Sequence, residues 1–196
     1  PHRMSSRVMR AALYEKSGPN IRLGAINTDQ AIRLLNDTNP SSGANLPGGL
    51  KLRRDYGRLI VSKGPGKDVH SYLYTVDGPC DLCITQTGAT LRFHVREAWD
   101  NLKFPEHDRN VAYFDFDLLS FPLEIRSAVK GDRLEPWGME GSTKVKKIFI
   151  DKKISARKRS KVPLIVKENI ILWIAGLRRS RFFPLSASTS RVLEIR

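Results

Sequence analysis

The sequence contains only two cysteines and no long apolar run. Both features limit the classes of protein to which the chain can belong. The longest apolar stretch, residues 170–177, is less than half of the roughly 20 residues that a membrane-spanning helix needs, so we expect a buried strand there. Cys80 and Cys83 form a single Cys-x-x-Cys, whereas a structural zinc site needs two further ligands. Their neighbours alternate as in a β-strand with one cysteine on each face, and we therefore interpret both as ordinary strand residues.

Catalytic and phosphate-binding signatures are also missing. The sequence has no G-x-x-x-x-G-K-[ST] loop, and no helix-turn-helix or zinc-finger spacing supports binding to DNA. Asp115 and Asp117 share one face of a predicted strand, where paired carboxylates can bind Mg²⁺, but no third ligand or catalytic histidine accompanies them. A metal or redox role for the cysteines stays open only if the fold brings His70, His94 or His107 close. We therefore predict no catalytic residue and no metal site in this chain.

Acidic residues are scarce relative to basic ones. The chain has 34 Lys and Arg against 20 Asp and Glu, which gives a formal net charge of +14. Nine of the basic residues lie between Lys144 and Lys161, where Asp151 is the single acid. A positive field this concentrated favours binding to polyanions through counterion release. We therefore predict a nucleic acid as the partner, with a solvated charged helix as the alternative.

Hydrophobic patterning divides the chain into three predicted segments and places it in the α+β class. Residues 1–45 form a short helical segment, because apolar residues recur at helical spacing and Asn27 can cap a second helix. Residues 46–110 form an antiparallel β-rich segment, since short alternating runs are separated by glycines. Residues 111–196 form a small α/β C-terminal domain that contains a basic helix.

The basic helix is predicted over residues 142–153, with Ser142 as its N-cap. Val145, Ile148 and Phe149 fall within one arc of about 100°, whereas the lysines point elsewhere. We therefore expect the helix to dock on a sheet by its apolar side and to leave its lysines exposed.

Several short motifs resemble, in their order and spacing, the C-terminal region of the tRNA(Ile)-lysidine synthases from residue 46 to residue 176. No single motif is diagnostic of this family, whereas the complete set in this order is. The motifs are Leu-Pro-Gly-Gly at 46–49, Arg-Asp-Tyr-Gly at 54–57, Arg126, Gly-Asp-Arg at 131–133, Pro136, Gly138, Lys144, Lys146, Lys147, Phe149, Asp151, Lys152, Arg159, Pro163, Leu164 and Gly176.

The resemblance implies a role in tRNA modification. In that family an N-terminal ATP-pyrophosphatase domain adenylates the wobble cytidine of the isoleucine tRNA with a CAU anticodon and joins it to lysine. The C-terminal domains bind the tRNA body, including the acceptor stem. The family's catalytic loop, Ser-Gly-Gly-x-Asp-Ser, is absent here, since the nearest string, at 42–45, is Ser-Gly-Ala-Asn. The resemblance therefore implies a segment that binds tRNA but is itself inactive.

The catalytic domain, with its ATP, Mg²⁺ and lysine, is expected outside this sequence, which opens on Pro-His-Arg-Met rather than on an initiator methionine. We therefore expect the chain to be part of a longer, cytoplasmic protein, in which residues 1–45 are the remnant of a middle tRNA-binding domain. A homodimer stays open.

Ten basic residues are predicted to contact RNA. An A-form helix hides its base edges, so cations on a protruding helix would reach its backbone and shallow groove. Arg126 and Arg133 offer guanidinium forks for a phosphate or a guanine edge, although Arg133 beside Asp132 fits a loop brace equally well. Trp137 could stack on a base, but its proline and glycine neighbours favour a loop anchor. The predicted RNA-binding residues are Arg126, Arg133, Lys144, Lys146, Lys147, Lys152, Lys153, Arg157, Lys158 and Arg159.

A stand-alone basic module, which binds structured RNA or mediates assembly without attached chemistry, is the alternative function. The reading frame upstream of Pro1 discriminates between the two hypotheses, because only the ligase requires a Ser-Gly-Gly-x-Asp-Ser loop there.

Overall fold

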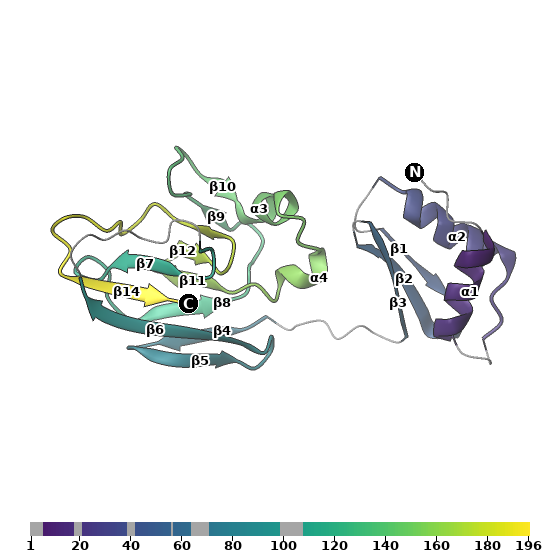
Figure 1. Ribbon diagram of the computed structural model, residues 1–196, viewed down its shortest axis with the longest axis horizontal. Helices are drawn as coiled ribbons and strands as arrows, with labels where there is room; N and C mark the ends of the chain where they lie inside the picture. The colour runs from purple at the N-terminus through teal and green to yellow at the C-terminus, as the bar shows by residue number, and fades with distance from the viewer. Residues whose placement is uncertain (1–5, 18–20, 39–41, 56, 64–70, 99–107) are drawn as a thin grey trace. The chain divides into compact units, whose positions relative to one another are not determined.

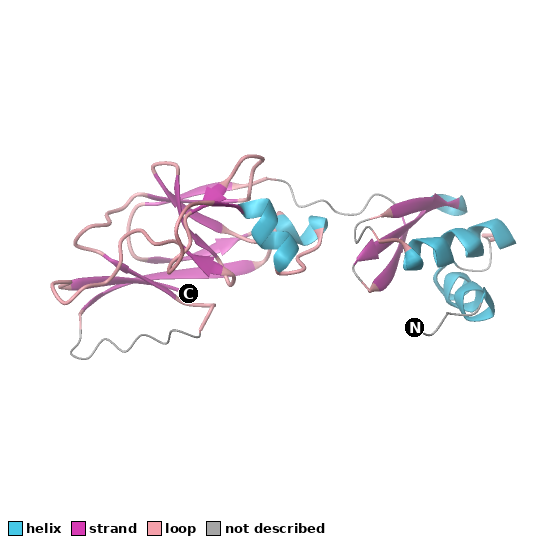
Figure 2. Ribbon diagram, turned by 90° about the horizontal axis from the view of Figure 1, so that it is seen from above, coloured by secondary structure: helices cyan, strands magenta, loops and turns pink. Residues whose placement is uncertain are grey.

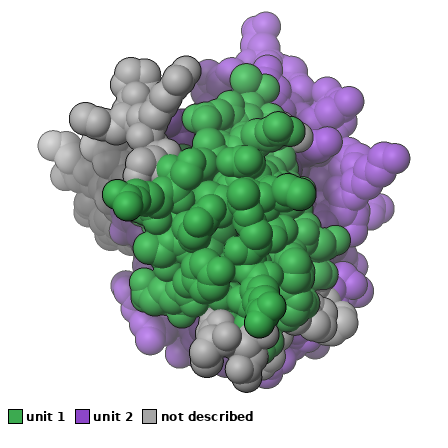
Figure 3. All heavy atoms as spheres, turned by 90° about the vertical axis from the view of Figure 1, so that its right-hand side faces the viewer, with its two compact units in different colours: residues 1–68 green, residues 69–196 purple. Residues whose placement is uncertain are grey.

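The chain forms two compact units, residues 1–68 and residues 69–196 (Figure 3). The computed structural model describes residues 6–17, 21–38, 42–55, 57–63, 71–98 and 108–196. Each unit has a hydrophobic core of its own and is described by itself. Within these described ranges, no helix combines the length and the apolar character needed to cross a membrane.

Unit 1 is a three-stranded antiparallel sheet with two helices packed on one of its faces (Figure 2). The strands follow in the order β1-β2-β3, and alternate residues of each strand point towards the helices. Leu50 and Leu52 of the central strand are buried in this way against Met9 and Leu13 of the first helix. The elements are α1 (Ser6–Ser17), α2 (Ala25–Asn36), β1 (Gly43–Leu46), the 3₁₀ turn η1 (Pro47–Gly49), β2 (Leu50–Asp55) and β3 (Arg58–Lys63).

The start of α2 differs from the prediction. Gly24 is the N-cap, and Asn27 lies at the third helical position, where its Oδ1 accepts a hydrogen bond of 2.9 Å from the Gly24 backbone N–H. The prediction of Asn27 as the N-cap was therefore wrong by three positions. An asparagine side chain can satisfy a backbone N–H from either position, and the sequence alone does not say which one it takes.

The described part of unit 2 contains two larger antiparallel sheets, a two-stranded sheet of β9 and β10, and two short helices (Figure 1). The five-stranded sheet has the order β13-β12-β11-β8-β4, and the four-stranded sheet has the order β5-β6-β14-β7. The elements are β4 (Leu73–Val76), β5 (Cys80–Ile84), β6 (Ala89–Glu97), β7 (Ala112–Asp115), β8 (Leu123–Arg126), β9 (Arg133–Leu134), β10 (Thr143–Lys144), α3 (Val145–Asp151), α4 (Ala156–Arg159), β11 (Leu164–Lys167), β12 (Ile170–Ile174), β13 (Arg178–Arg179) and β14 (Arg191–Ile195).

The core of unit 2 lies on both faces of the five-stranded sheet. On one face, Ile165 of β11 packs in a cluster that also contains Phe93 and Leu193 of the four-stranded sheet. On the other face, the neighbouring residues Leu164 and Val166 pack in a second cluster with α3. Successive side chains of a strand point to opposite faces, so β11 joins the three layers. Its neighbour β12 also contributes to both clusters, Leu172 and Trp173 to the first and Ile171 and Ile174 to the second, and residues 170–177 contain the buried strand that the sequence predicts.

The α+β class is confirmed, because the strands pair in antiparallel fashion and the α-helices of the described residues occur in two places, before β1 and between β10 and β11, rather than alternating with the strands. The boundary between the compact units falls at residues 68 and 69, inside the segment 46–110 that the sequence analysis treats as one β-rich segment. Strand β4 pairs with β8 and β6 pairs with β14 of the C-terminal segment, whereas β2 and β3 pack under the helices of unit 1. Alternation marks a strand but does not indicate which sheet it joins.

Candidate nucleic-acid interface

Helix α3 presents the central part of the basic run to solvent. Val145, Ile148 and Phe149 are buried against the five-stranded sheet, as the sequence predicts, while Lys146 and Lys147 are exposed between them. The apolar side therefore fixes the helix, and the lysines are displayed without being needed for packing.

The start of α3 differs from the prediction. Thr143 and Lys144 form strand β10, which pairs with β9, and the helix begins only at Val145. Ser142 is therefore not an N-cap. It accepts hydrogen bonds from Arg133 instead, 2.8 Å from Nε to its Oγ and 3.0 Å from Nη2 to its carbonyl oxygen. Two of the five guanidinium N–H donors of Arg133 are used in bracing the β9–β10 hairpin.

The cations that follow α3 are exposed to different degrees. Lys152 and Lys153 are exposed in the turn after the helix, and Lys158 is exposed on α4. Arg157 and Arg159 of α4 are partly buried, and Arg159 Nε donates a hydrogen bond of 2.9 Å to the Ile154 carbonyl. Arg159 therefore helps to hold the backbone of this segment, while its lysines extend into solvent.

Lysines of the basic run have no acidic partner in the described part of the chain. Neither an ion pair nor a side-chain hydrogen bond engages them there, and Asp151, the acid of the run, is itself exposed. Their charge is therefore available to an external anion. The lysines are Lys144, Lys146, Lys147, Lys152, Lys153, Lys158 and Lys161.

Arg126 is engaged within the protein. Its Nη1 and Nη2 donate hydrogen bonds of 2.9 Å each to the two carboxylate oxygens of Asp132, and their side chains are only 18% and 8% exposed. Asp132 also accepts a 2.8 Å bond from the Val129 backbone N–H. The hydrogen bonds to Asp132 raise the pKa of Arg126. This bidentate pair braces the loop between β8 and β9, and it occupies the fork that was predicted to contact RNA.

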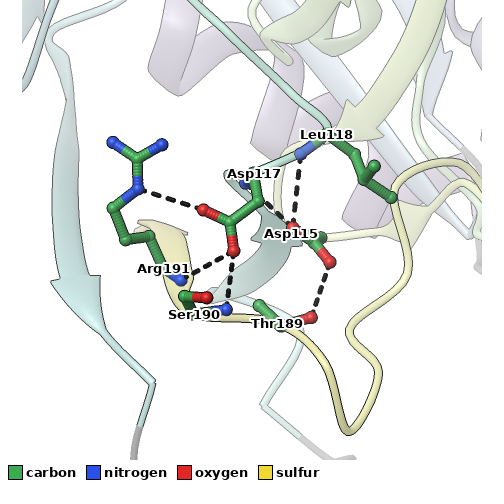
Figure 4. A network of polar contacts seen from close by, with 6 residues as sticks. All are labelled: Asp115, Asp117, Leu118, Thr189, Ser190 and Arg191. Carbon is green, nitrogen blue, oxygen red and sulfur yellow. Dashed lines mark hydrogen bonds and ion pairs between the residues drawn. The ribbon is translucent and has the colours of Figure 1, made fainter.

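Asp115 and Asp117 hold β14 to the end of β7 (Figure 4). Asp115 is buried and accepts hydrogen bonds from the Thr189 hydroxyl at 2.6 Å and from the Asp117 backbone N–H at 2.9 Å. Asp117 accepts bonds from the Ser190 backbone N–H at 2.6 Å and from Arg191 Nε at 3.0 Å. Their oxygens are thus used in connecting two distant segments, which explains two carboxylates at this spacing without a metal ion.

The cysteines lie on strand β5 as free, exposed thiols. Among the described residues, no three His, Cys, Asp or Glu side chains gather as metal ligands. His94 lies on β6, while His70 and His107 fall outside the described residues.

Unit 1 carries cations that the prediction did not include. Lys51 and Arg53 of β2 alternate with the buried leucines of that strand, so they lie on the sheet face opposite the helices. Arg58 of β3 lies on the same face, because its register partner is Asp55, two residues along from Arg53. The alternation of leucine and cation at residues 50–53 is the sequence signal for this surface.

The arginines of β13 were also absent from the prediction. Arg179 Nε donates a 2.9 Å hydrogen bond to the Tyr113 carbonyl, and its guanidinium lies 4.9 Å from the centre of the Trp137 ring. The Leu-Arg-Arg-Ser-Arg string at 177–181 is a second basic cluster in the sequence, but nothing in that string indicates which arginine would turn inward.

Comparison with known proteins identifies the family. Residues 123–195 match the family described as the TilS substrate C-terminal domain. The chain is 29% identical over its whole length to the tRNA(Ile)-lysidine synthase of Symbiobacterium thermophilum, and 36% identical over 82% of its length to that of Shouchella clausii. It spans only 41% and 33% of those two proteins.

A solved structure shows the same relationship. The crystal structure of a TilS C-terminal domain matches 65% of this chain and 95% of that domain, with a TM-score of 0.58 and 25% sequence identity. Residues 123–195 therefore belong to the family of TilS substrate C-terminal domains, and the chain as a whole is similar to the C-terminal part of tRNA(Ile)-lysidine synthases.

Proposed function

We propose that this chain is the tRNA-binding part of a tRNA(Ile)-lysidine synthase. The observation that carries the proposal is the row of exposed lysines on α3 and its flanking turns, which have no acidic partner in the described part of the molecule. The parent enzyme would attach lysine to the wobble cytidine of the isoleucine tRNA with a CAU anticodon, which changes its identity from methionine to isoleucine. This segment would hold the tRNA body and acceptor stem during that reaction.

The lysines suit contact with the RNA backbone. An A-form helix offers its phosphates and 2′-hydroxyls over a wide, shallow groove, and compact ammonium groups on a rigid helix can reach several of them. Such contacts position an RNA more than they read its sequence. Of the ten predicted residues, Arg126 and Arg159 would act mainly by shaping the surface, since their guanidinium groups bind the protein itself.

The remaining expectations concern the parent protein. ATP, Mg²⁺ and lysine would bind to its catalytic domain and would reach this chain only through that domain. A tRNA-modifying ligase would act in the cytoplasm, where its substrate is found. A homodimer stays a prediction.

Reversing the charge of three lysines tests the proposal. The variant Lys146→Glu, Lys147→Glu, Lys153→Glu should bind tRNA about 10- to 100-fold more weakly, because phosphate contacts are replaced by repulsion. The slope of log affinity against log salt concentration should become shallower by about one for each lost contact. Titration of labelled tRNA with the full chain at several salt concentrations measures both quantities.

The matched control reverses Arg92, Arg96 and Arg109, three exposed cations of unit 2 outside the basic run, and changes the net charge by the same amount. We expect this control to weaken binding much less and to keep the slope. Equal losses in the two variants would mean that net charge alone attracts the RNA. Unchanged binding in the lysine variant would refute the assignment of the site.

A further inference from the structure

Trp137 is a large aromatic residue that stays exposed although the fold holds it in place. It lies in the connection between β9 and β10 and is 53% exposed. Its backbone N–H donates a 3.1 Å hydrogen bond to the Arg179 carbonyl, and the Arg179 guanidinium carbon lies 4.9 Å from its ring centre. The next residue, Gly138, has a φ of +72°, which lets the chain turn directly after the indole.

Arg179 is itself fixed from several sides. Its Nε donates to the Tyr113 carbonyl at 2.9 Å and its Nη2 to the Phe183 carbonyl at 3.0 Å, and its guanidinium also lies 4.7 Å from the centre of the Phe114 ring. Burial lowers the pKa of Arg179 to about 10, so the group stays positively charged at neutral pH. One side of the indole therefore rests on an immobile cation, and the orientation of the ring is set before any ligand arrives.

The surroundings of this indole are basic. Arg133 and Lys144 lie on the two strands that the loop connects, and Arg178 lies beside Arg179 on β13. The loop also contains Glu140, which is exposed. A flat aromatic surface among cations fits a flat ring that is attached to a phosphate, which is the chemistry of a nucleotide.

We propose that Trp137 is a stacking platform for one unpaired nucleobase of the bound RNA, a role that rests on the proposed function. A paired base in an A-form helix is stacked on both of its sides, whereas an unpaired base can offer a whole ring face to an aromatic side chain. Arg179 is a positioning residue in this arrangement, because it orients the indole from the opposite side.

The test compares three RNAs and three variants of the full chain. The RNAs are a tRNA transcript, an acceptor-stem hairpin with a single-stranded 3′ tail, and the same hairpin with a blunt end. Trp137→Ala should bind tRNA about tenfold more weakly, a loss typical of a removed base-stacking contact. Trp137→Phe should stay within about threefold of the wild type, because it keeps an aromatic face.

Met139→Ala is the matched control, since Met139 is 54% exposed in the same loop but has no ring. We expect it to bind like the wild type. Binding of Trp137→Ala to the blunt hairpin should also be normal. A loss on the tailed hairpin would assign the base to the 3′ end, and a loss on tRNA alone would assign it to a loop. Both of these results support the platform.

Three outcomes would overturn the platform: wild-type affinity of Trp137→Ala for tRNA, an equal loss on the blunt hairpin, or an equal loss in Met139→Ala, which would indicate a general apolar contact. Failure of the proposed function is a separate result, because the wild-type chain would then fail to bind tRNA at all. Thermal unfolding of each variant checks that the fold is kept.

Discussion

At the scale of single residues, the cations of unit 2 separate into two kinds by what they contact. Arg126 and Arg133 donate to Asp132 and Ser142, and thereby brace the loops on which they lie. Lysines such as Lys146 and Lys147 are exposed and have no ion pair among the described residues. The difference follows from chemistry, because a planar fork suits fixed partners inside a fold while a flexible ammonium suits an external phosphate.

Asp117 should make the free energy of unfolding of unit 2 depend on pH in the acidic range. The Ser190 backbone N–H, followed by Arg191, lowers the pKa of Asp117 below its usual value. The carboxylate therefore stabilises the fold fully above its unfolded pKa, and this contribution is lost as the pH falls through the folded pKa. The free energy of unfolding in urea of wild type and Asp117→Asn should differ near neutral pH and converge as the pH falls through the folded pKa of Asp117.

Asp81→Asn is the control for this pH dependence, because Asp81 forms an exposed pair with Arg92 at 3.4 Å. Exposed pairs contribute little, so the variant should follow the wild type at all pH values. A difference between Asp117→Asn and wild type that is constant over the whole pH range would contradict the account.

The sequence shows which charged residues lie close together along the chain, but it does not show which residues their side chains contact in the fold. The spacing of Asp115 and Asp117 was readable from the sequence, but their contacts with Thr189 and Arg191 join segments that are more than 70 positions apart. Arg133 had two equally good interpretations, and the hydrogen bonds to Ser142 now favour the brace.

At the scale of elements, α3 shows what spacing can and cannot determine. Its apolar arc of Val145, Ile148 and Phe149 was predicted and is confirmed. Its N-cap was predicted two residues too early, at Ser142 instead of Lys144, because the chain before Val145 pairs as β10 with β9. A two-residue strand leaves no alternation to detect, so the helix pattern was extended into it.

Removing the buried aromatic side chain of α3 should destabilise unit 2. Phe149 is 2% exposed in the cluster between the helix and the sheet, so Phe149→Ala should lower the free energy of unfolding by about 3–5 kcal/mol. Ile150→Ala, on the next residue, should cost less than about 1 kcal/mol, because Ile150 is 45% exposed. Urea unfolding followed by circular dichroism measures both. Similar losses in the two variants would mean that the helix does not dock by this face.

At the scale of the whole molecule, the chain folds into two units, and both of them carry more basic than acidic residues. The total charge of +14 and the α+β class were readable from the sequence. The boundary at residue 68 was not, because strands on both sides of it have the same alternating pattern, and β4 and β6 pair with strands far along the chain. Basic surfaces therefore occur on both units, although the sequence directed attention only to the second.

The most direct test of the central claim compares two halves of a tRNA. The dissociation constant of the full chain is measured at one salt concentration for an isolated acceptor-stem hairpin and for an isolated anticodon-arm hairpin of equal length. We predict at least about tenfold tighter binding to the acceptor stem, since equal charge in the two RNAs leaves shape and contacts as the difference. Equal affinity for both hairpins, or preference for the anticodon arm, would contradict the proposal that this chain holds the tRNA by its acceptor stem.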